Sequence, residues 1–365
     1  MRGMRGTRGR WLGVLCAGIV LLAGSLPAVS TASTSRFPIL YGRSTTLYST
    51  AGRNLSVSQY YHRVFVPLGR TLFVYDYDGN MITRLRFANY VGSTAMPADG
   101  RVAYVTADDA LLCLDARTGG VRWRKPLPGL ARDIALAAGR VWVVVEPPNG
   151  FTRLLSVNPN LPTRSWVEVP RWAGGEAKVA VGAGGALRRI AWTTGGANEG
   201  SITVAAAHPD GTISGQRTYR STGSHELEPL AAQFSANGGE VAFLGDSFAN
   251  PDGSNDPALG LWDLTKPGIV DRTFVTTHGS AGQVALSPSG RHLVGTIRGW
   301  LYVWSTSNPS KPVKTVVFSP DVWPTLQGLA VTPDGRYAFC MVNRDGTQSD
   351  WQPELLRIGI GVANW

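Results

Sequence analysis

Carboxylate and imidazole side chains next to apolar segments are the groups in this sequence that could perform acid–base chemistry. A general base needs a tunable proton affinity, which a histidine or a crowded carboxylate provides. If the protein is an enzyme, the candidate catalytic residues are His225, Glu226, His278, Asp133 and Asp321. No His-Glu-x-x-His motif accompanies them. Solvated surface residues are therefore the alternative interpretation, and it is the one that the sequence favours.

One polar segment carries oxygen donors at alternating positions, which is how a loop can wrap around Ca²⁺. The candidate metal ligands are Asn250, Asp252, Ser254 and Asp256. A calcium-binding loop of this kind has a glutamate at its twelfth position. In this chain the twelfth residue, counted from Asp252, is Asp263, and it lies within a predicted strand. A plain polar loop is therefore favoured over a calcium site. We accordingly expect no cofactor, with Ca²⁺ as the alternative.

A repeated sequence segment, which we call the repeated phrase, marks the structural units of the chain. Residues 282–306 predict three short strands separated by two tight turns, because apolar runs alternate with Pro-Ser-Gly and Arg-Gly. The first part of the phrase recurs at residues 95–104, 233–243 and 330–339, with one residue inserted in the second of these copies. Glycine supplies the positive φ that a hairpin turn requires. A phrase repeated every few tens of residues predicts a repeat architecture.

The spacing of these turns predicts the fold. The first turn of each unit contains a glycine, and the glycines concerned are Gly100, Gly139, Gly185, Gly239, Gly290 and Gly335. Their separations are 39, 46, 54, 51 and 45 residues, close to the roughly 40–50 residues of one four-stranded propeller blade. We therefore predict an all-β, seven-bladed β-propeller. The last unit lacks a fourth strand, and we predict that an N-terminal strand within residues 37–49 completes this blade, because an open edge would remain otherwise.

Two segments resemble known propeller families. The residues that resemble a WD-repeat are His278-Gly279, Val284 to Gly290, Tyr302 to Ser305 and the Trp-Asp pair in Leu261-Trp262-Asp263-Leu264. The family's aspartate before the third strand is replaced by Ile297-Arg298, and this resemblance covers two or three of the seven predicted units. Residues 111–123 look instead like the repeat of quinoprotein-type propellers, over one unit.

These mixed resemblances imply the propeller fold but select no function, because this fold hosts many functions. The quinoprotein-like unit also suggests a cell-envelope assembly factor as a third possible role. Cys16 lies inside the N-terminal apolar run, which counts against the lipoprotein form of such a factor.

The N-terminus has the three parts of a secretory signal peptide. Four arginines precede an apolar run at residues 11–26, and small residues follow it. The run is shorter than the ~20 residues of a membrane-spanning helix, so an uncleaved anchor is the less favoured alternative. We predict a signal peptide at residues 1–32 and a single propeller domain at residues 33–365. The mature protein would then be secreted or periplasmic, without a transmembrane segment.

The charge distribution argues against nucleic acid as a partner. The chain has 35 basic and 25 acidic residues and a net charge of +10. Removing residues 1–32 takes away four arginines and no acid, which leaves +6. The remaining arginines are scattered and adjacent only at Arg188-Arg189, whereas nucleic-acid binders cluster their basic residues.

The two cysteines of the mature chain are predicted to be free. Cys113 falls in the second predicted unit and Cys340 in the last, with the first unit between them. A disulfide requires Cα atoms within about 7 Å of each other. We therefore predict two buried thiols.

Function is expected on one face of the propeller, which we call the loop face. It consists of the loops from each fourth strand to the next first strand and of the loops between second and third strands. Three of the latter are long, at residues 193–200, 245–258 and 343–353, and long loops are commonly functional. The expected ligand-binding residues are Tyr90, Arg132, Arg171, Trp172, Trp323 and Trp351. Exposed aromatic rings suit sugar stacking or a protein contact, and packing between blades is the alternative.

We therefore predict a monomeric, exported binding scaffold that holds a protein, peptide or glycan on its loop face and channel mouth. The alternative is a propeller enzyme, namely a lactonase, a lyase or a quinone-dependent dehydrogenase, with its site at the same mouth. An enzyme would bring three or more carboxylates or imidazoles within hydrogen-bond reach of one point. A binder would expose an apolar or aromatic patch rimmed by polar groups.

Overall fold

The computed structural model describes residues 34–38, 55–148, 152–169, 178–180, 188–194, 201–220, 227–235, 239–247, 256–266, 271–274, 281–287, 289–297, 300–308, 310–317, 328–343 and 353–361. Every regular element in these ranges is a β-strand, and none of them contains a helix long and apolar enough to span a bilayer. The predicted signal peptide lies outside the described residues.

The first part of the chain forms three antiparallel sheets of four strands each. Sheet 1 contains β2 (Ser56–Ser58), β3 (Arg63–Leu68), β4 (Thr71–Asp76) and β5 (Met81–Arg86). Sheet 2 contains β6 (Val91–Ala95), β7 (Val102–Ala107), β8 (Ala110–Asp115) and β9 (Val121–Pro126). Sheet 3 contains β10 (Leu130–Ala137), β11 (Arg140–Glu146), β12 (Arg153–Val157) and β13 (Val167–Glu168).

The remaining described strands form four more sheets of four strands. Sheet 4 contains β14 (Lys178–Ala180), β15 (Arg189–Thr194), β16 (Ser201–Ala207) and β17 (Ile213–Arg220). Sheet 5 contains β18 (Leu227–Phe234), β19 (Glu240–Ser247), β20 (Asp256–Asp263) and β21 (Asp271–Phe274). Sheet 6 contains β22 (Ala281–Leu286), β23 (His292–Ile297), β24 (Trp300–Ser305) and β25 (Lys314–Val317). Sheet 7 contains β26 (Gly328–Val331), β27 (Tyr337–Asn343), β28 (Pro353–Gly359) and β1 (Thr34–Pro38).

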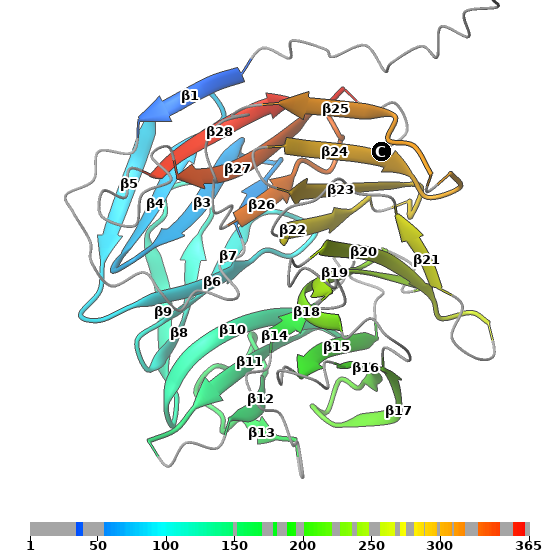
Figure 1. Cartoon of the computed structure of the whole chain (residues 1–365). Coiled ribbons are helices and arrows are strands. Elements are labelled where there is room, and N and C mark those ends of the chain that lie inside the picture. Colours follow the sequence, from blue (N-terminus) through cyan, green and yellow to red (C-terminus); the bar gives the residue numbers. More distant parts are fainter. Residues whose placement is uncertain are drawn as a thin grey trace, which may run out of the picture.

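The prediction of an all-β protein built from four-stranded units is confirmed. Figure 1 shows the sheets side by side around a common centre, with first strands such as β6, β10 and β22 toward the middle. The turn glycines Gly100, Gly139, Gly290 and Gly335 have φ values between 63° and 71°, as their hairpin positions require.

Sheet 7 combines both ends of the described chain. β1 pairs with β28 in an antiparallel register that runs from Thr34 opposite Ile358 to Pro38 opposite Glu354. The sequence predicts this strand within residues 37–49, so the expected position is wrong by several residues. Pro38 explains the difference. Proline has no N–H group to donate to the ladder, so the strand ends at this residue instead of beginning near it.

Apolar clusters fill the spaces between neighbouring sheets. Phe65 of sheet 1 packs with Leu112 of sheet 2, and Trp142 of sheet 3 packs with Ile190 of sheet 4. A further cluster joins sheet 1 to sheet 7 and includes Phe339. Trp142, Trp262 and Trp304 are among the largest fully buried side chains. Burial of these faces is the main source of stability in such stacked sheets.

Positive charges also bridge neighbouring sheets. The Lys125 ammonium, from β9, donates to the carbonyl oxygens of Pro162 and Arg164 in sheet 3 at 2.8 and 2.6 Å. Lys314, from β25, donates to two carbonyl oxygens at the end of β28, each at 3.0 Å. In both cases the acceptors lie at or beyond the end of the third strand of the next sheet.

Arginines make the same kind of contact at four other junctions. The donors and their carbonyl acceptors are Arg63 with Arg117, Arg140 with Pro209, Arg217 with Leu264, and Arg357 with Tyr77. We call these four arginines and the two lysines the bridging cations. Burial lowers the pKa of Lys125 and of Lys314, which shows that their lost hydration has a cost. Charge-assisted hydrogen bonds to carbonyls offset that cost.

Replacing Lys125 by methionine tests the contribution of one bridging cation. We expect the free energy of unfolding to fall by about 2 kcal/mol, because hydrogen bonds from a charged donor are lost while the stem is conserved. Urea titration followed by circular dichroism measures this change. The matched control is Lys266→Met, which removes an exposed lysine paired with Asp263 at 3.1 Å and is expected to cost less than about 1 kcal/mol. Equal effects of both substitutions would contradict the bridging role.

Both predicted free thiols are confirmed, since Cys113 and Cys340 are buried and form no disulfide. Burial raises the pKa of the Cys113 thiol to about 11 and also raises that of Cys340. We expect neither thiol to react with a maleimide dye in the native protein at neutral pH, because the thiolate is the reactive form. Both should react in denaturant. Fast labelling of the native protein, measured by mass spectrometry, would disagree with this structure.

Candidate functional site

A single aspartate organises the loop face of sheets 2 and 3. The carboxylate of Asp108, in the turn between β7 and β8, accepts hydrogen bonds from the backbone N–H groups of Ala88, Asn89 and Tyr90 at 3.2, 2.8 and 2.9 Å. These three residues form the connection from β5 to β6, which is a loop from a fourth strand to a first strand. Asp108 therefore ties together the two kinds of loop that make up this face.

The main chain of Asp108 extends the same network. Its N–H group donates to the carbonyl of Tyr90 at 2.8 Å, and its own carbonyl accepts from the N–H group of Ala131 in sheet 3 at 2.9 Å. Asp108 has a φ of 51°, a left-handed conformation that aspartate tolerates better than most residues. The strained turn is held by bonds to both neighbouring segments.

A β-bulge in β10 places the next functional side chain. The pairing of β10 with β11 shifts between Ala131 and Asp133, which leaves Arg132 without a partner in the ladder. Bulges of this kind re-aim a side chain at the edge of a sheet. The Arg132 Nε atom donates to Glu146 Oε2 at 2.7 Å, and its guanidinium carbon lies 6.0 Å from the centre of the Tyr90 ring.

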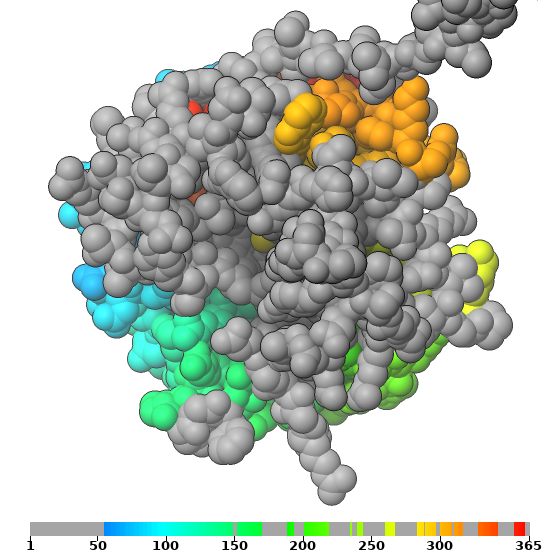
Figure 2. Space-filling model, in the orientation of Figure 1, coloured from blue at the N-terminus to red at the C-terminus, as the bar shows by residue number. Residues whose placement is uncertain are grey.

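Tyr90, Arg132 and Glu146 form what we call the loop-face triad. The side chains of Arg132 and Glu146 are 37% and 42% exposed, and Tyr90 is half-buried. An aromatic ring, a guanidinium and a carboxylate thus share one solvent-accessible place. Figure 2 shows that sheets 2 and 3, coloured cyan to green, form adjoining parts of the molecular surface.

A buried polar group lies next to the triad. Asp133 is 3% exposed, and its Oδ1 atom accepts from the N–H group of Ile134 at 2.8 Å. On the neighbouring strand β6, Ser93 is fully buried and its hydroxyl has no hydrogen-bond partner among the described residues. A side chain at Gly92 would lie 2.7 Å from the Arg132 carbonyl oxygen, so this glycine permits the close approach of β6 to β10.

The structure brings together some of the residues predicted from sequence. Tyr90 and Arg132 lie near each other, and Asp133 follows Arg132 directly. Arg132 and Asp133 belong to strand β10 rather than to a rim loop, and Asp133 is not a solvated rim residue. Eight of the predicted residues lie outside the described ranges: His225, Glu226, His278, Asp321, Arg171, Trp172, Trp323 and Trp351.

The suggested calcium loop is shorter than predicted. Asp256 lies in β20, opposite Ser247 of β19, because the two strands continue to pair farther than the polar sequence indicates. The other three candidate ligands, Asn250, Asp252 and Ser254, lie outside the described residues. Within the described ranges, no group of three or more histidine, cysteine, aspartate or glutamate side chains is placed to hold a metal ion.

Two members of the network were not predicted from sequence. Asp108 lies in a short turn, whereas functional residues were expected in long loops. Its signal was an aspartate inside a tight turn, a position where a carboxylate commonly bonds to nearby N–H groups. Glu146 ends β11. Its contact with Arg132 depends on the bulge in β10, which the sequence alone does not predict.

Sequence comparison finds one related family. Residues 70–245, which extend from sheet 1 into sheet 5, match the family described as "Outer membrane protein assembly factor BamB". This match covers slightly less than half of the chain. Together with the stacked four-stranded sheets, it shows that the chain has the β-propeller repeat fold. The chain combines quinoprotein-like and WD-like features, as the sequence resemblances imply.

Solved structures support the propeller fold. Kuenenia stuttgartiensis hydrazine synthase aligns with a TM-score of 0.67 and 12% identity, over 88% of this chain and 100% of that chain. The Neurospora crassa Pan2 WD40 domain aligns with a TM-score of 0.60 and 13% identity, over 86% of this chain and 90% of that chain. A chain of the mitotic checkpoint complex aligns with a TM-score of 0.63 and 12% identity, over 91% of this chain and 96% of that chain. No curated protein matches this sequence. At these identities the similarity shows the fold alone.

Substituting Asp108 tests whether it holds the loop face. We expect Asp108→Ala to speed amide hydrogen exchange at residues 88–90 by about tenfold or more, because three acceptor contacts are lost and alanine tolerates the positive φ poorly. Exchange is followed by mass spectrometry. The matched control is Asp109→Ala, since the neighbouring carboxylate is 66% exposed and pairs with Arg124 at 3.4 Å. Unchanged exchange in Asp108→Ala would refute this role.

Proposed function

We propose that this propeller is an exported binding scaffold that holds a protein, peptide or glycan on its loop face and channel mouth. The observation that carries the proposal is the loop-face triad. Tyrosine and arginine are enriched at the energetic centres of protein interfaces, and the tyrosine ring also suits stacking on a sugar. The Asp108 network fixes the surrounding backbone before any ligand arrives, which reduces the entropy lost on binding.

We also propose that the seven sheets are the blades of one ring, closed by β1. Three contacts between sheets 1 and 7 support this proposal. Asp334 donates its N–H to Gln59 Oε1 at 3.1 Å, and Arg357 pairs with Asp78 at 3.2 Å. The rings of Tyr77 and Phe339 lie 5.1 Å apart. Residues 33–365 would then be one monomeric domain.

Export rests on the sequence of residues 1–32, which has the form of a cleavable signal peptide. The family that matches residues 70–245 is named for an outer-membrane assembly factor. That name agrees with a secreted or periplasmic location and with a protein partner. A structural relative from the mitotic checkpoint complex likewise belongs to a protein assembly.

A propeller enzyme is the second candidate function, and the buried carboxylate of Asp133 is the observation that favours it. Carboxyl groups with restricted hydration near a channel mouth are suited to acid–base chemistry. A lactonase, lyase or quinone-dependent dehydrogenase would need further groups converging on the same point. Turnover of a lactone, a uronate-containing glycan or an alcohol with added quinone, abolished in Asp133→Asn, would establish this alternative.

The binding proposal is tested with the double variant Tyr90→Ala/Arg132→Ala. Immobilised wild-type and variant proteins are exposed to cell-envelope extract and to a glycan array, and the captured ligand is then titrated. We expect the variant to lose about 2 kcal/mol of binding free energy, roughly thirtyfold in Kd. Arg153→Ala, which removes a half-buried arginine paired with Glu168 in sheet 3, is the matched control. If the double variant binds every captured ligand as tightly as wild type, the loop-face triad is not the binding site.

A further inference from the structure

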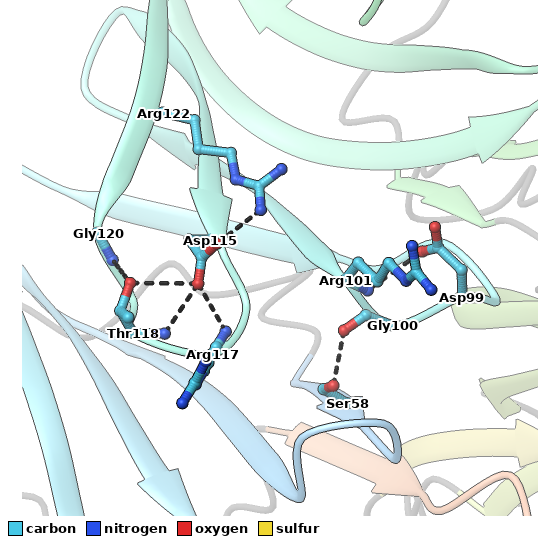
Figure 3. A network of polar contacts seen from close by, with 9 residues as sticks. All are labelled: Ser58, Asp99, Gly100, Arg101, Asp115, Arg117, Thr118, Gly120 and Arg122. Atoms are coloured by element: carbon cyan, nitrogen blue, oxygen red, sulfur yellow. Dashed lines mark hydrogen bonds and ion pairs between the residues drawn. The ribbon is translucent and has the colours of Figure 1, made fainter.

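The face opposite the loop face carries a second surface, built from turns of sheets 1 and 2. The Ser58 hydroxyl donates to the carbonyl of Gly100 at 2.7 Å and accepts from the N–H group of Tyr61 at 3.1 Å. It thereby fastens the first turn of sheet 1 to the first turn of sheet 2. Figure 3 shows this contact beside Arg101.

A third turn is fixed to the same assembly. The Asp115 carboxylate accepts from the N–H groups of Arg117 and Thr118 at 2.9 and 3.0 Å and pairs with Arg122 at 2.6 Å. The bridging cation Arg63 donates to the carbonyl of Arg117 at 3.4 Å. Figure 3 shows Arg117 and Arg122 on either side of Asp115. The backbone beneath this surface is therefore held in place by hydrogen bonds between sheets.

This rigid base presents an exposed aromatic ring with one guanidinium group above it. Tyr60 is 60% exposed, its ring centre lies 4.7 Å from that of Tyr61, and the Arg101 guanidinium carbon lies 5.2 Å above the Tyr60 ring. Arg101 and Arg117 are both exposed. We call Tyr60, Tyr61, Arg101 and Arg117 the turn-face patch.

The guanidinium groups of the patch are available to a partner. The Asp99 carboxylate accepts from the backbone N–H group of Arg101 at 3.1 Å, and Asp115 is engaged by Arg122. Among the described residues, no carboxylate forms an ion pair with the side chain of Arg101 or Arg117. An arginine fork without an acidic partner is suited to bidentate binding of a carboxylate.

We propose that the turn-face patch binds an acidic segment of a protein partner, with carboxylates on Arg101 and Arg117 and an apolar or aromatic side chain on Tyr60. The positions of Asp99 and Asp115 favour a peptide over a continuous anionic surface. They interrupt the positive charge, so the patch lacks the continuous basic surface that an anionic membrane requires, whereas a peptide needs only one carboxylate at each guanidinium group. The surface is distinct from the loop-face triad, so the protein would contact two partners on opposite faces.

The fixed turns make this surface ready to bind. Gly100 has a φ of 63°, and a side chain there would lie 3.1 Å from the Ser58 hydroxyl, so the first turn of sheet 2 depends on this residue. Because the bonds of Ser58, Asp115 and Arg63 already order the backbone, a partner would order only the exposed side chains.

Binding of a defined acidic probe tests the proposal. A short fluorescein-labelled peptide of repeated Glu-Tyr-Glu-Gly is titrated with the mature protein at physiological salt and followed by fluorescence anisotropy. We expect Arg101→Glu/Arg117→Glu to raise Kd by about tenfold or more, because reversed charges repel the carboxylates. Tyr60→Ala should weaken binding severalfold through loss of the ring. Thermal unfolding of each variant establishes that the fold is intact.

The matched control is Arg291→Glu. Arg291 is exposed and follows Gly290 in the first turn of sheet 6, the same position that Arg101 occupies in sheet 2. Its Kd should remain within about twofold of wild type. A comparable loss in Arg291→Glu would attribute binding to overall charge and overturn the proposal, as would absence of peptide binding. Binding to phosphatidylglycerol vesicles that the peptide fails to displace would assign the patch to a membrane instead.

Discussion

Positive charge donated to main-chain carbonyls is the interaction on which the stacking of these sheets depends. Apolar packing between sheets is strong but non-directional, and alone it would allow one sheet to slide or rotate on the next. A bridging cation such as Lys125 fixes both the distance and the rotation, because it must meet particular carbonyl oxygens of the next sheet. The scattered arginines of this basic chain are explained in part by this role, and so is the absence of a continuous basic stripe in the sequence.

Side chains of opposite charge satisfy backbone groups that lie between neighbouring sheets. On the turn side, cations supply donors to carbonyls that the ladders leave without partners, whereas on the loop side the Asp108 carboxylate supplies an acceptor to three N–H groups. Buried or half-buried backbone groups need such partners. Carboxylates such as Asp115 also accept from N–H groups on the turn side, but within one turn of a single sheet. The side chains left over, such as Arg132 on one face and Arg101 on the other, are available for recognition.

Local patterns predicted much of the fold. Turn glycines such as Gly290, the alternation of strands such as β24 and the buried thiols follow from nearby residues, because strand period and turn geometry are local properties. The candidate site was predicted less completely. Contacts such as Arg132 with Glu146, or Ser58 with Gly100, depend on a bulge or on the register between sheets, which no local pattern specifies. Asp256 was misplaced because polar composition indicated a loop where tertiary pairing extends a strand.

The pairing of β1 with β28 joins residues at opposite ends of the polypeptide, with Thr34 opposite Ile358. During synthesis, or during passage through a translocation channel, β1 finds its partner only after β28 has emerged. Such distant pairings form late because a long loop must close before they gain any energy. A nascent or truncated chain would meanwhile expose a strand with unsatisfied backbone groups, a surface that promotes aggregation and chaperone binding. Completion of sheet 7 thus requires that β1 and β28, the first and last strands that the structure describes, are both available.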